Sequence, residues 1–184
     1  MIRACTAADN AAICAVVNDA AAAYRGVIPA DRWREPYMPR AELEAEIAAG
    51  VAFLGCEEAG ALVGVMGTQP IDDVMLIRHA YVVSARRRRG IGGKLLGACL
   101  ARTSRPVLIG TWAAASWAID FYRKHGFAVI DGAEKDRLLA TYWSIPARQI
   151  ETSVVLADRR WQARRAGRLT SPPASPAHGS RGRG

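Results

Sequence analysis

One junction constrains the fold of this chain more than any other part of the sequence. An apolar, β-branched segment ends at Val83, a helical pattern begins after Gly90, and a run of arginines and glycines lies between them. The first N–H groups of a helix have no partner within the helix, and the helix dipole adds partial positive charge there. Glycine, which lacks Cβ, lets backbone approach an anion closely. The junction therefore predicts a phosphate-binding site between a strand and a helix. A tight turn followed by a solvated basic loop is the alternative interpretation.

Two familiar phosphate motifs do not fit this junction. The sequence contains no GxxxxGK[ST] run, which excludes a mononucleotide P-loop. It also lacks a GxGxxG run, because Leu95 stands where the third glycine would be. The anion site is therefore neither of these two nucleotide-binding loops.

Hydrophobic periodicity and turn residues predict a single α/β domain with a mixed sheet. We expect helices at residues 6–24, 39–50, 90–102, 116–125 and 134–143, and strands at residues 2–5, 51–56, 62–68, 74–83, 107–112, 127–130 and 150–156. Residues 25–38 hold two prolines and two large aromatics, so we expect a loop with at most one helical turn.

The net charge of +8 is unevenly distributed. Residues 159–184 contain seven arginines and no acidic residue, whereas residues 1–158 contain 18 basic and 17 acidic residues. We therefore expect a nearly neutral domain at residues 1–158 and a basic, Pro/Gly/Arg-rich, disordered tail at residues 159–184.

Other features of the sequence point away from a membrane, a secreted or a metal-binding protein. The N-terminus lacks the pattern of a secretion signal, and no window reaches about 18 uninterrupted apolar residues. The four cysteines show no CxxC spacing and lie among apolar or small residues. We expect a cytoplasmic protein without a metal and with reduced cysteines.

Two blocks of sequence resemble one family. The residues Tyr81-Val82-Val83, Arg87-x-x-Gly90-x-Gly92 and Leu95-Leu96 resemble the Q/R-x-x-G-x-G/A signature of the GNAT superfamily of acetyl-CoA-dependent N-acetyltransferases. About 30 residues later, Ala118-x-x-x-Tyr122-x-x-x-Gly126-Phe127 resembles that family's helix and strand. The resemblance implies a GNAT fold, with a mixed, mostly antiparallel sheet flanked by helices. Ala115 stands where relatives often have Asn, and Ser84 where Pro is common.

The same resemblance implies acetyl-CoA as co-substrate and direct transfer of its acetyl group to a primary amine. The strand at residues 107–112 would splay from the strand before the loop and leave a slot for the cofactor. The cofactor-binding residues implied by position are Ala80, Tyr81, Val82, Arg87, Arg88, Arg89, Gly90, Ile91, Gly92 and Gly93.

The resemblance also suggests two catalytic residues. Tyr122 matches the general acid of many relatives, since a phenol with an ordinary pKa of about 10 is protonated at neutral pH; a core tyrosine is the alternative. Histidine side chains ordinarily titrate near neutrality, which makes His79 a candidate general base, although a structural histidine or a water relay would also fit. Relatives often place a carboxylate farther back on this strand, where this chain has apolar residues such as Leu76.

The acceptor is expected to be a small-molecule amine. Tyr24, Trp33 and Tyr37 surround the first loop, which helps form the acceptor pocket in relatives, and residues 134–148 are a candidate lid. The alternatives are acetylation of a protein amino group, an acetyl-CoA-binding sensor, and nucleic-acid binding through the arginines of the loop and tail. The final strand offers an edge for a homodimer.

Overall fold

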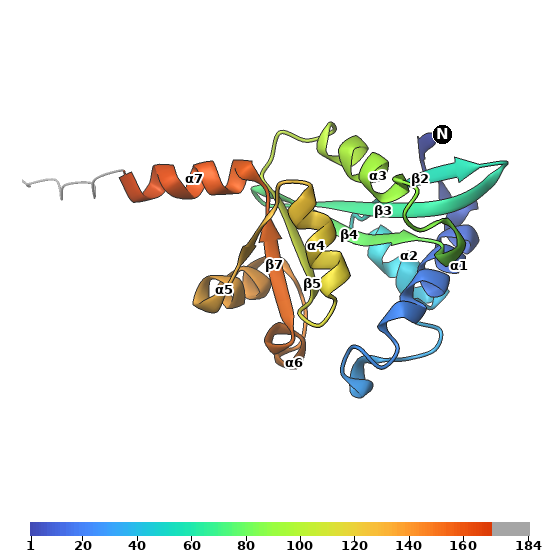
Figure 1. Ribbon diagram of the computed structural model, residues 1–184, viewed down its shortest axis with the longest axis horizontal. Helices are drawn as coiled ribbons and strands as arrows, with labels where there is room; N and C mark the ends of the chain where they lie inside the picture. The colour runs from blue at the N-terminus through green and yellow to red at the C-terminus, as the bar shows by residue number, and fades with distance from the viewer. Residues whose placement is uncertain (171–184) are drawn as a thin grey trace, which may run out of the picture.

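The computed structural model describes residues 1–170 and shows a single seven-stranded sheet in the order β1-β2-β3-β4-β5-β7-β6 (Figure 1). All neighbouring strands are antiparallel except β4 and β5, which are parallel. The strands are β1 (Ile2–Ala4), β2 (Ala52–Glu58), β3 (Ala61–Ile71), β4 (Val74–Val82), β5 (Val107–Trp112), β6 (Ala128–Ile130) and β7 (Ser153–Ala157). The α-helices are α1 (Asn10–Ala21), α2 (Arg40–Ala48), α3 (Ile91–Leu100), α4 (Ser116–Lys124), α5 (Gly132–Tyr142), α6 (Ala147–Glu151) and α7 (Arg159–Thr170). The expected GNAT fold is confirmed.

Both faces of the sheet are covered, because the central strands are apolar on both sides. Ile77 and Ile109 face a core formed with α3 and α4, which contains Leu95, Leu96 and Tyr122. The neighbouring residues on the same strands, Leu76 and Leu108, point to the opposite face. That face is shared by two helical groups: α1 and α2 cover the first strands, and α5 and α7 cover the last ones.

The parallel strands β4 and β5 separate after a short contact. They pair only at Met75–Val107, Leu76–Leu108 and Ile77–Ile109. Beyond these pairs the sheet opens, and Figure 1 shows the two strands diverging at this end. The expected splay is therefore present, and the later residues of both strands line the gap.

A bulge in β4 lies where this gap begins. Residues 79 and 80 stand opposite the single residue Met66, between the pairs Gly67–Arg78 and Val65–Tyr81. His79 has φ +50°, a left-handed conformation that is uncommon outside glycine and costs energy unless neighbouring contacts fix it. Bulges re-aim side chains beside functional sites, and this one turns β4 at the mouth of the gap.

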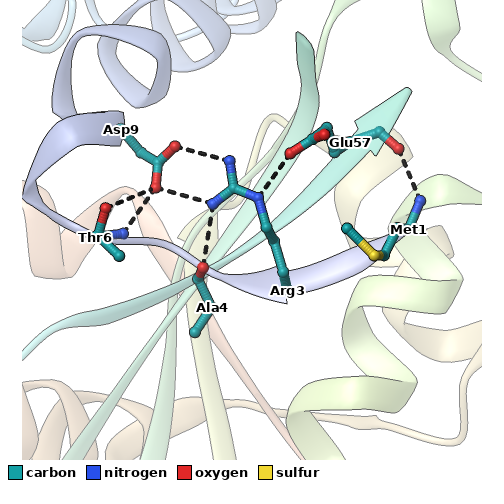
Figure 2. A network of polar contacts seen from close by, with 6 residues as sticks. All are labelled: Met1, Arg3, Ala4, Thr6, Asp9 and Glu57. Atoms are coloured by element: carbon teal, nitrogen blue, oxygen red, sulfur yellow. Dashed lines mark hydrogen bonds and ion pairs between the residues drawn. The ribbon is translucent and has the colours of Figure 1, made fainter. Parts of the chain in front are cut away.

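The N-terminus is fixed to the sheet by a polar network around Arg3 (Figure 2). The Arg3 guanidinium donates to both carboxylate oxygens of Asp9, at 2.8 and 2.9 Å, and to Glu57 on β2 at 2.7 Å. Asp9 also accepts from the Thr6 N–H at 2.8 Å, which is the reciprocal half of a capping box. Arg3 thus joins the edge strand, its neighbour and the entry to α1.

Two expectations near the C-terminus were wrong. The segment expected as a strand from residue 150 begins as helix α6, and β7 starts only at Ser153. The first part of the expected disordered tail is helix α7, which projects from the body in Figure 1. Its first turn is held by Asp158, whose carboxylate accepts from the Trp161 N–H, and by Arg160, which donates to the carbonyl of Thr103. The rest of the expected tail lies outside the described residues.

The strand expected to offer a dimerisation edge is internal. β7 pairs with β5 on one side and with β6 on the other, so the edges of the sheet are β1 and β6. Within residues 1–170, no helix is long and apolar enough to cross a membrane.

Candidate active site

The loop after β4 has the backbone geometry of an anion site. Gly90 caps α3 with φ +77°, and Arg88 also has a positive φ, +62°. The first bond into the helix runs from the Lys94 N–H to the Gly90 carbonyl at 3.0 Å. The N–H groups of Ile91, Gly92 and Gly93 therefore precede the intrahelical ladder and are open to a phosphate group.

The three glycines of the loop are favoured for different structural reasons. No heavy atom lies within 4 Å of a Cβ placed on Gly90, so glycine is favoured there because of the positive φ and not because of crowding. A Cβ on Gly92 would lie 3.3 Å from the Phe121 ring, and one on Gly93 would lie 2.9 Å from His125 Nε2. Gly92 and Gly93 therefore let α4 pack closely against α3. This reason for glycine differs from the expected one, which was close approach of the backbone to an anion. His125 Nδ1 lies 2.8 Å from the Phe121 carbonyl, in the last turn of α4.

The arginines of the loop point in different directions. Arg87 donates to the Ala20 carbonyl at the end of α1, at 2.9 Å. Arg86 lies 3.3 Å from the Glu58 carboxylate. Arg88 and Arg89 are exposed and lie directly before the open N–H groups. The loop thus offers backbone donors and two exposed cations, and these fit the diphosphate of coenzyme A.

A cavity of about 520 Å³ opens where β4 and β5 separate. It lies between the two helical groups that share one face of the sheet. Its lining comes from the loop before α2, from α2, β4 and β5, and from the segment around α5 and α6; the aromatic members are Tyr24, Trp33, Tyr37, Tyr81, Trp112 and Trp143. The three aromatics expected in an acceptor pocket, Tyr24, Trp33 and Tyr37, are therefore brought together in one cavity.

These aromatic rings contact one another closely. The Tyr24 ring lies 5.9 Å from the Tyr37 ring and 6.3 Å from the Tyr81 ring, the latter edge-on. Trp33 lies 5.7 Å from Tyr37. Burial raises the pKa of Tyr24 to about 12, to which the nearby Tyr37 phenol also contributes. The first loop is thus packed into a wall of the cavity with its Tyr24 phenol protonated.

The expected lid also lies against this cavity. Trp143, Ser144, Ile145 and Pro146 contribute to its lining, together with Gln149 of α6. Trp143 is packed so closely on β5 that a Cβ at Gly110 would lie 3.2 Å from its ring. This segment closes the cavity from the side opposite the aromatic loop.

Tyr122 occupies a different position from the other candidates. It is 5% exposed and lies in the core between the sheet, α3 and α4. Its ring is edge-on to Phe121 at 5.0 Å and to Phe127 at 5.9 Å, and it is not among the residues that line the cavity. Burial raises the pKa of its phenol, to which nearby Tyr24 and Cys99 add. The phenol is therefore protonated at neutral pH, as a proton donor must be.

His79 lines the cavity beside a carboxylate that the sequence analysis did not identify. Its Nε2 lies 3.3 Å from Glu46 Oε2, and Glu46 Oε1 accepts from Arg78 at 2.7 Å. Burial alone would raise the pKa of Glu46, but His79 and Arg78 together lower it. The structure thus places an ionised carboxylate in the cavity, supplied by α2 instead of by β4.

The position where relatives often carry Asn is inaccessible to solvent. Ala115 is fully buried and packs with Ile28 and Trp112. At the other departure, the Ser84 N–H donates to the Asp19 carboxylate at 2.5 Å. Ser84 thereby ties the start of the loop to α1, a bond that proline could not make.

Comparisons with known proteins identify a family and similar folds. Residues 16–139 match the family model described as an acetyltransferase (GNAT) domain. The fold is similar to that of the PaiA N-acetyltransferase from Thermoplasma acidophilum in complex with coenzyme A, with a TM-score of 0.65 and 19% identity over 86% of this chain and 97% of that chain. It is also similar to the ribosomal-protein-S18-alanine N-acetyltransferase from Escherichia coli, with a TM-score of 0.57 and 15% identity over 86% and 92% of the two chains. A GNAT family acetyltransferase from Elizabethkingia anophelis with acetyl-CoA bound has a TM-score of 0.56 and 20% identity over 86% and 96%. Against curated protein sequences the chain has no significant match.

Proposed function

The chain belongs to the GNAT acetyltransferase family, and on that premise we propose that it transfers the acetyl group of acetyl-CoA directly to the primary amine of a small molecule. The enzyme class and the acetyl donor follow from the family. The proposal concerns the acceptor, the direct transfer and the residues that take part.

The observation that carries this proposal is the cavity at the mouth of the β4–β5 gap. A volume of about 520 Å³ is within the usual range for small-molecule sites. The aromatic loop forms one wall and the segment around Trp143 forms another. These walls limit the size of the group that can enter, which favours a compact acceptor.

The donor side consists of the gap and the start of α3. The backbone of Ala80, Tyr81 and Val82 would bind the pantetheine arm, and the loop from Arg87 to Gly93 would bind the diphosphate, chiefly through Arg88, Arg89 and the open N–H groups. When bound, acetyl-CoA supplies an activated acetyl thioester. The chain itself orients the two substrates and moves protons.

The acceptor side would bind an amine among the aromatic rings. Tyr24, Trp33 and Tyr37 would supply aromatic surface around the amine, and Glu46 would supply a negative charge. One side of the Trp33 ring already faces the Arg25 guanidinium, which lies 5.3 Å from the ring centroid. His79 would take a proton from the ammonium group so that the neutral amine can attack. Tyr122 would return a proton to the departing sulfur.

A thiol-release assay with acetyl-CoA tests this function. A panel of polyamines, amino acids, aminoglycosides and peptides would be compared, with calorimetry of coenzyme A binding beside it. We expect coenzyme A to bind and a compact amine to be preferred over peptides. Selective acetylation of peptide amino groups would contradict the proposed acceptor class.

A further inference from the structure

The inference concerns how His79 is held, and it rests on the proposed function. The imidazole is fixed on two sides. Its ring stacks on the Phe53 ring with centroids 5.9 Å apart, and its Nε2 lies 3.3 Å from Glu46 Oε2. The side chain is only 14% exposed. With its backbone set by the bulge, the ring has little freedom to turn.

The two nitrogens of this ring have different surroundings. Nε2 is buried and has no aligned hydrogen bond within residues 1–170, and the Glu46 carboxylate oxygen lies 3.3 Å from it. A buried N–H is stabilised by a carboxylate, whereas a buried lone pair facing a carboxylate would be repelled. The Nε2–H tautomer is therefore favoured, and Nδ1 is then the nitrogen with a free lone pair.

Glu46 is itself held in place. Its other oxygen accepts from Arg78, and Arg78 also donates to Gln69 Oε1 at 2.8 Å. Gln69 in turn donates to the Ala49 carbonyl at the end of α2, at 2.8 Å. This polar chain joins α2, β3 and β4 and leaves one oxygen of the carboxylate for His79.

We propose that Glu46 is a positioning residue for catalysis: it holds His79 with Nε2–H toward its carboxylate, so that Nδ1 accepts the proton of the acceptor amine. The amine nitrogen then attacks the thioester carbonyl, a C–N bond forms and the C–S bond breaks. His79 takes the ammonium proton before this attack and releases it to solvent. It takes the second nitrogen proton as the C–S bond breaks, and the departing sulfur takes a proton from solvent or from Tyr122, which regains one from solvent. The imidazolium so formed faces the negative charge of Glu46.

The charges around the ring determine the effect of pH. Glu46 from α2 favours the protonated ring, Arg78 from β4 opposes it, and Phe53 from β2 is neutral. Removing the Glu46 charge leaves Arg78 unopposed, so in Glu46→Gln we expect the acidic limb of kcat/KM to move to lower pH. The plateau rate should fall on the order of 10-fold or more, because the ring is no longer oriented.

The experiment combines NMR of the 15N-histidine-labelled full chain with pH–rate profiles. In the wild-type protein, we expect the His79 ring to carry its proton on Nε2 at high pH. An Nδ1–H tautomer would overturn the proposal, whether or not any variant folds. Glu46→Gln is compared with Glu44→Gln, an exposed glutamate on the same helix that pairs with Arg40. Glu44→Gln should leave both the tautomer and the profile unchanged, and Glu46→Asp should partly restore the rate.

Two further outcomes separate this inference from the function it rests on. If Glu46→Gln keeps the wild-type tautomer, pH limb and rate, Glu46 does not position His79 and the inference fails. If the wild-type protein acetylates no amine, the proposed function fails instead, and the NMR result still decides how His79 is held.

Discussion

Replacing Tyr122 by Phe tests the proposed proton-donating role of this residue separately from its packing. Phe keeps the ring and its edge-on contacts with Phe121 and Phe127. The lost hydroxyl should change the free energy of unfolding by no more than about 1 kcal/mol. Loss of a general acid typically lowers a rate about 100-fold or more, which corresponds to about 2.7 kcal/mol of transition-state stabilisation.

The assay is initial-rate kinetics with acetyl-CoA as the varied substrate, beside thermal unfolding. We expect kcat of Tyr122→Phe to fall about 100-fold, with little change in KM for acetyl-CoA. Tyr142→Phe is the matched control. The Tyr142 phenol donates a hydrogen bond to the Asp73 carboxylate at 2.7 Å, and Tyr142 does not line the cavity. That control should lose about 1 kcal/mol of stability and keep its turnover. Unchanged kcat in Tyr122→Phe would remove this residue from the mechanism.

Three further predictions follow from the geometry. Because Gly90 has φ +77°, Gly90→Ala should lower the free energy of unfolding by about 1 kcal/mol in thermal melts and weaken coenzyme A binding in calorimetry. Gly97→Ala on the same helix should not destabilise the protein. Equal effects of the two substitutions would refute the geometric argument. Trp143→Ala should lower the free energy of unfolding by about 3–5 kcal/mol, measured in urea, and raise KM for the acceptor more than KM for acetyl-CoA. An unchanged acceptor KM would exclude a role for this segment as a lid. Burial raises the pKa of Tyr24 to about 12, so the folded chain keeps a proton that the unfolded chain loses near pH 10. Its stabilising effect is therefore complete below pH 10 and lost by about pH 12, and Tyr24→Phe should flatten the fall of Tm between these values.

Local patterns in the sequence predicted the junction between β4 and α3 and the helix α1. The change from strand to helix around Gly90 and the stripe of Ile13, Val16 and Val17 on α1 are short-range signals, and the structure has both. The gathering of Tyr24 and Trp33 in one cavity was expected only through the resemblance. It depends on how a loop packs over a sheet, which periodicity does not encode.

The glutamate beside His79 was missed because α2 does not follow its apolar pattern. Leu43 and Ile47, four residues apart, predict a shared buried face. Only Leu43 is buried; Ile47 is 36% exposed, and Glu46 turns inward toward Arg78 and His79. Tertiary ion pairing decides this rotation. The available signal was a glutamate three residues from the buried leucine, on the same side of the helix.

Helix α7 was missed because its composition resembles a disordered tail. Five of its twelve residues are arginines, and composition alone predicts no packed core. The local signal was Asp158 followed three residues later by Trp161, a helix N-cap with an apolar residue to bury. Trp161 packs under the sheet at 8% exposure, and Arg164 and Arg165 pair with Asp73 and Glu134.

Direct transfer between two substrates held in one site is the central claim, and the initial-rate pattern with both substrates varied tests it most directly. In the proposed function the donor and the acceptor meet where β4 and β5 separate, and none of the described cysteines lines the cavity there. Both substrates must then be bound together, so double-reciprocal plots should give lines that intersect. Parallel lines, the pattern of an acetyl-enzyme intermediate, would contradict the account.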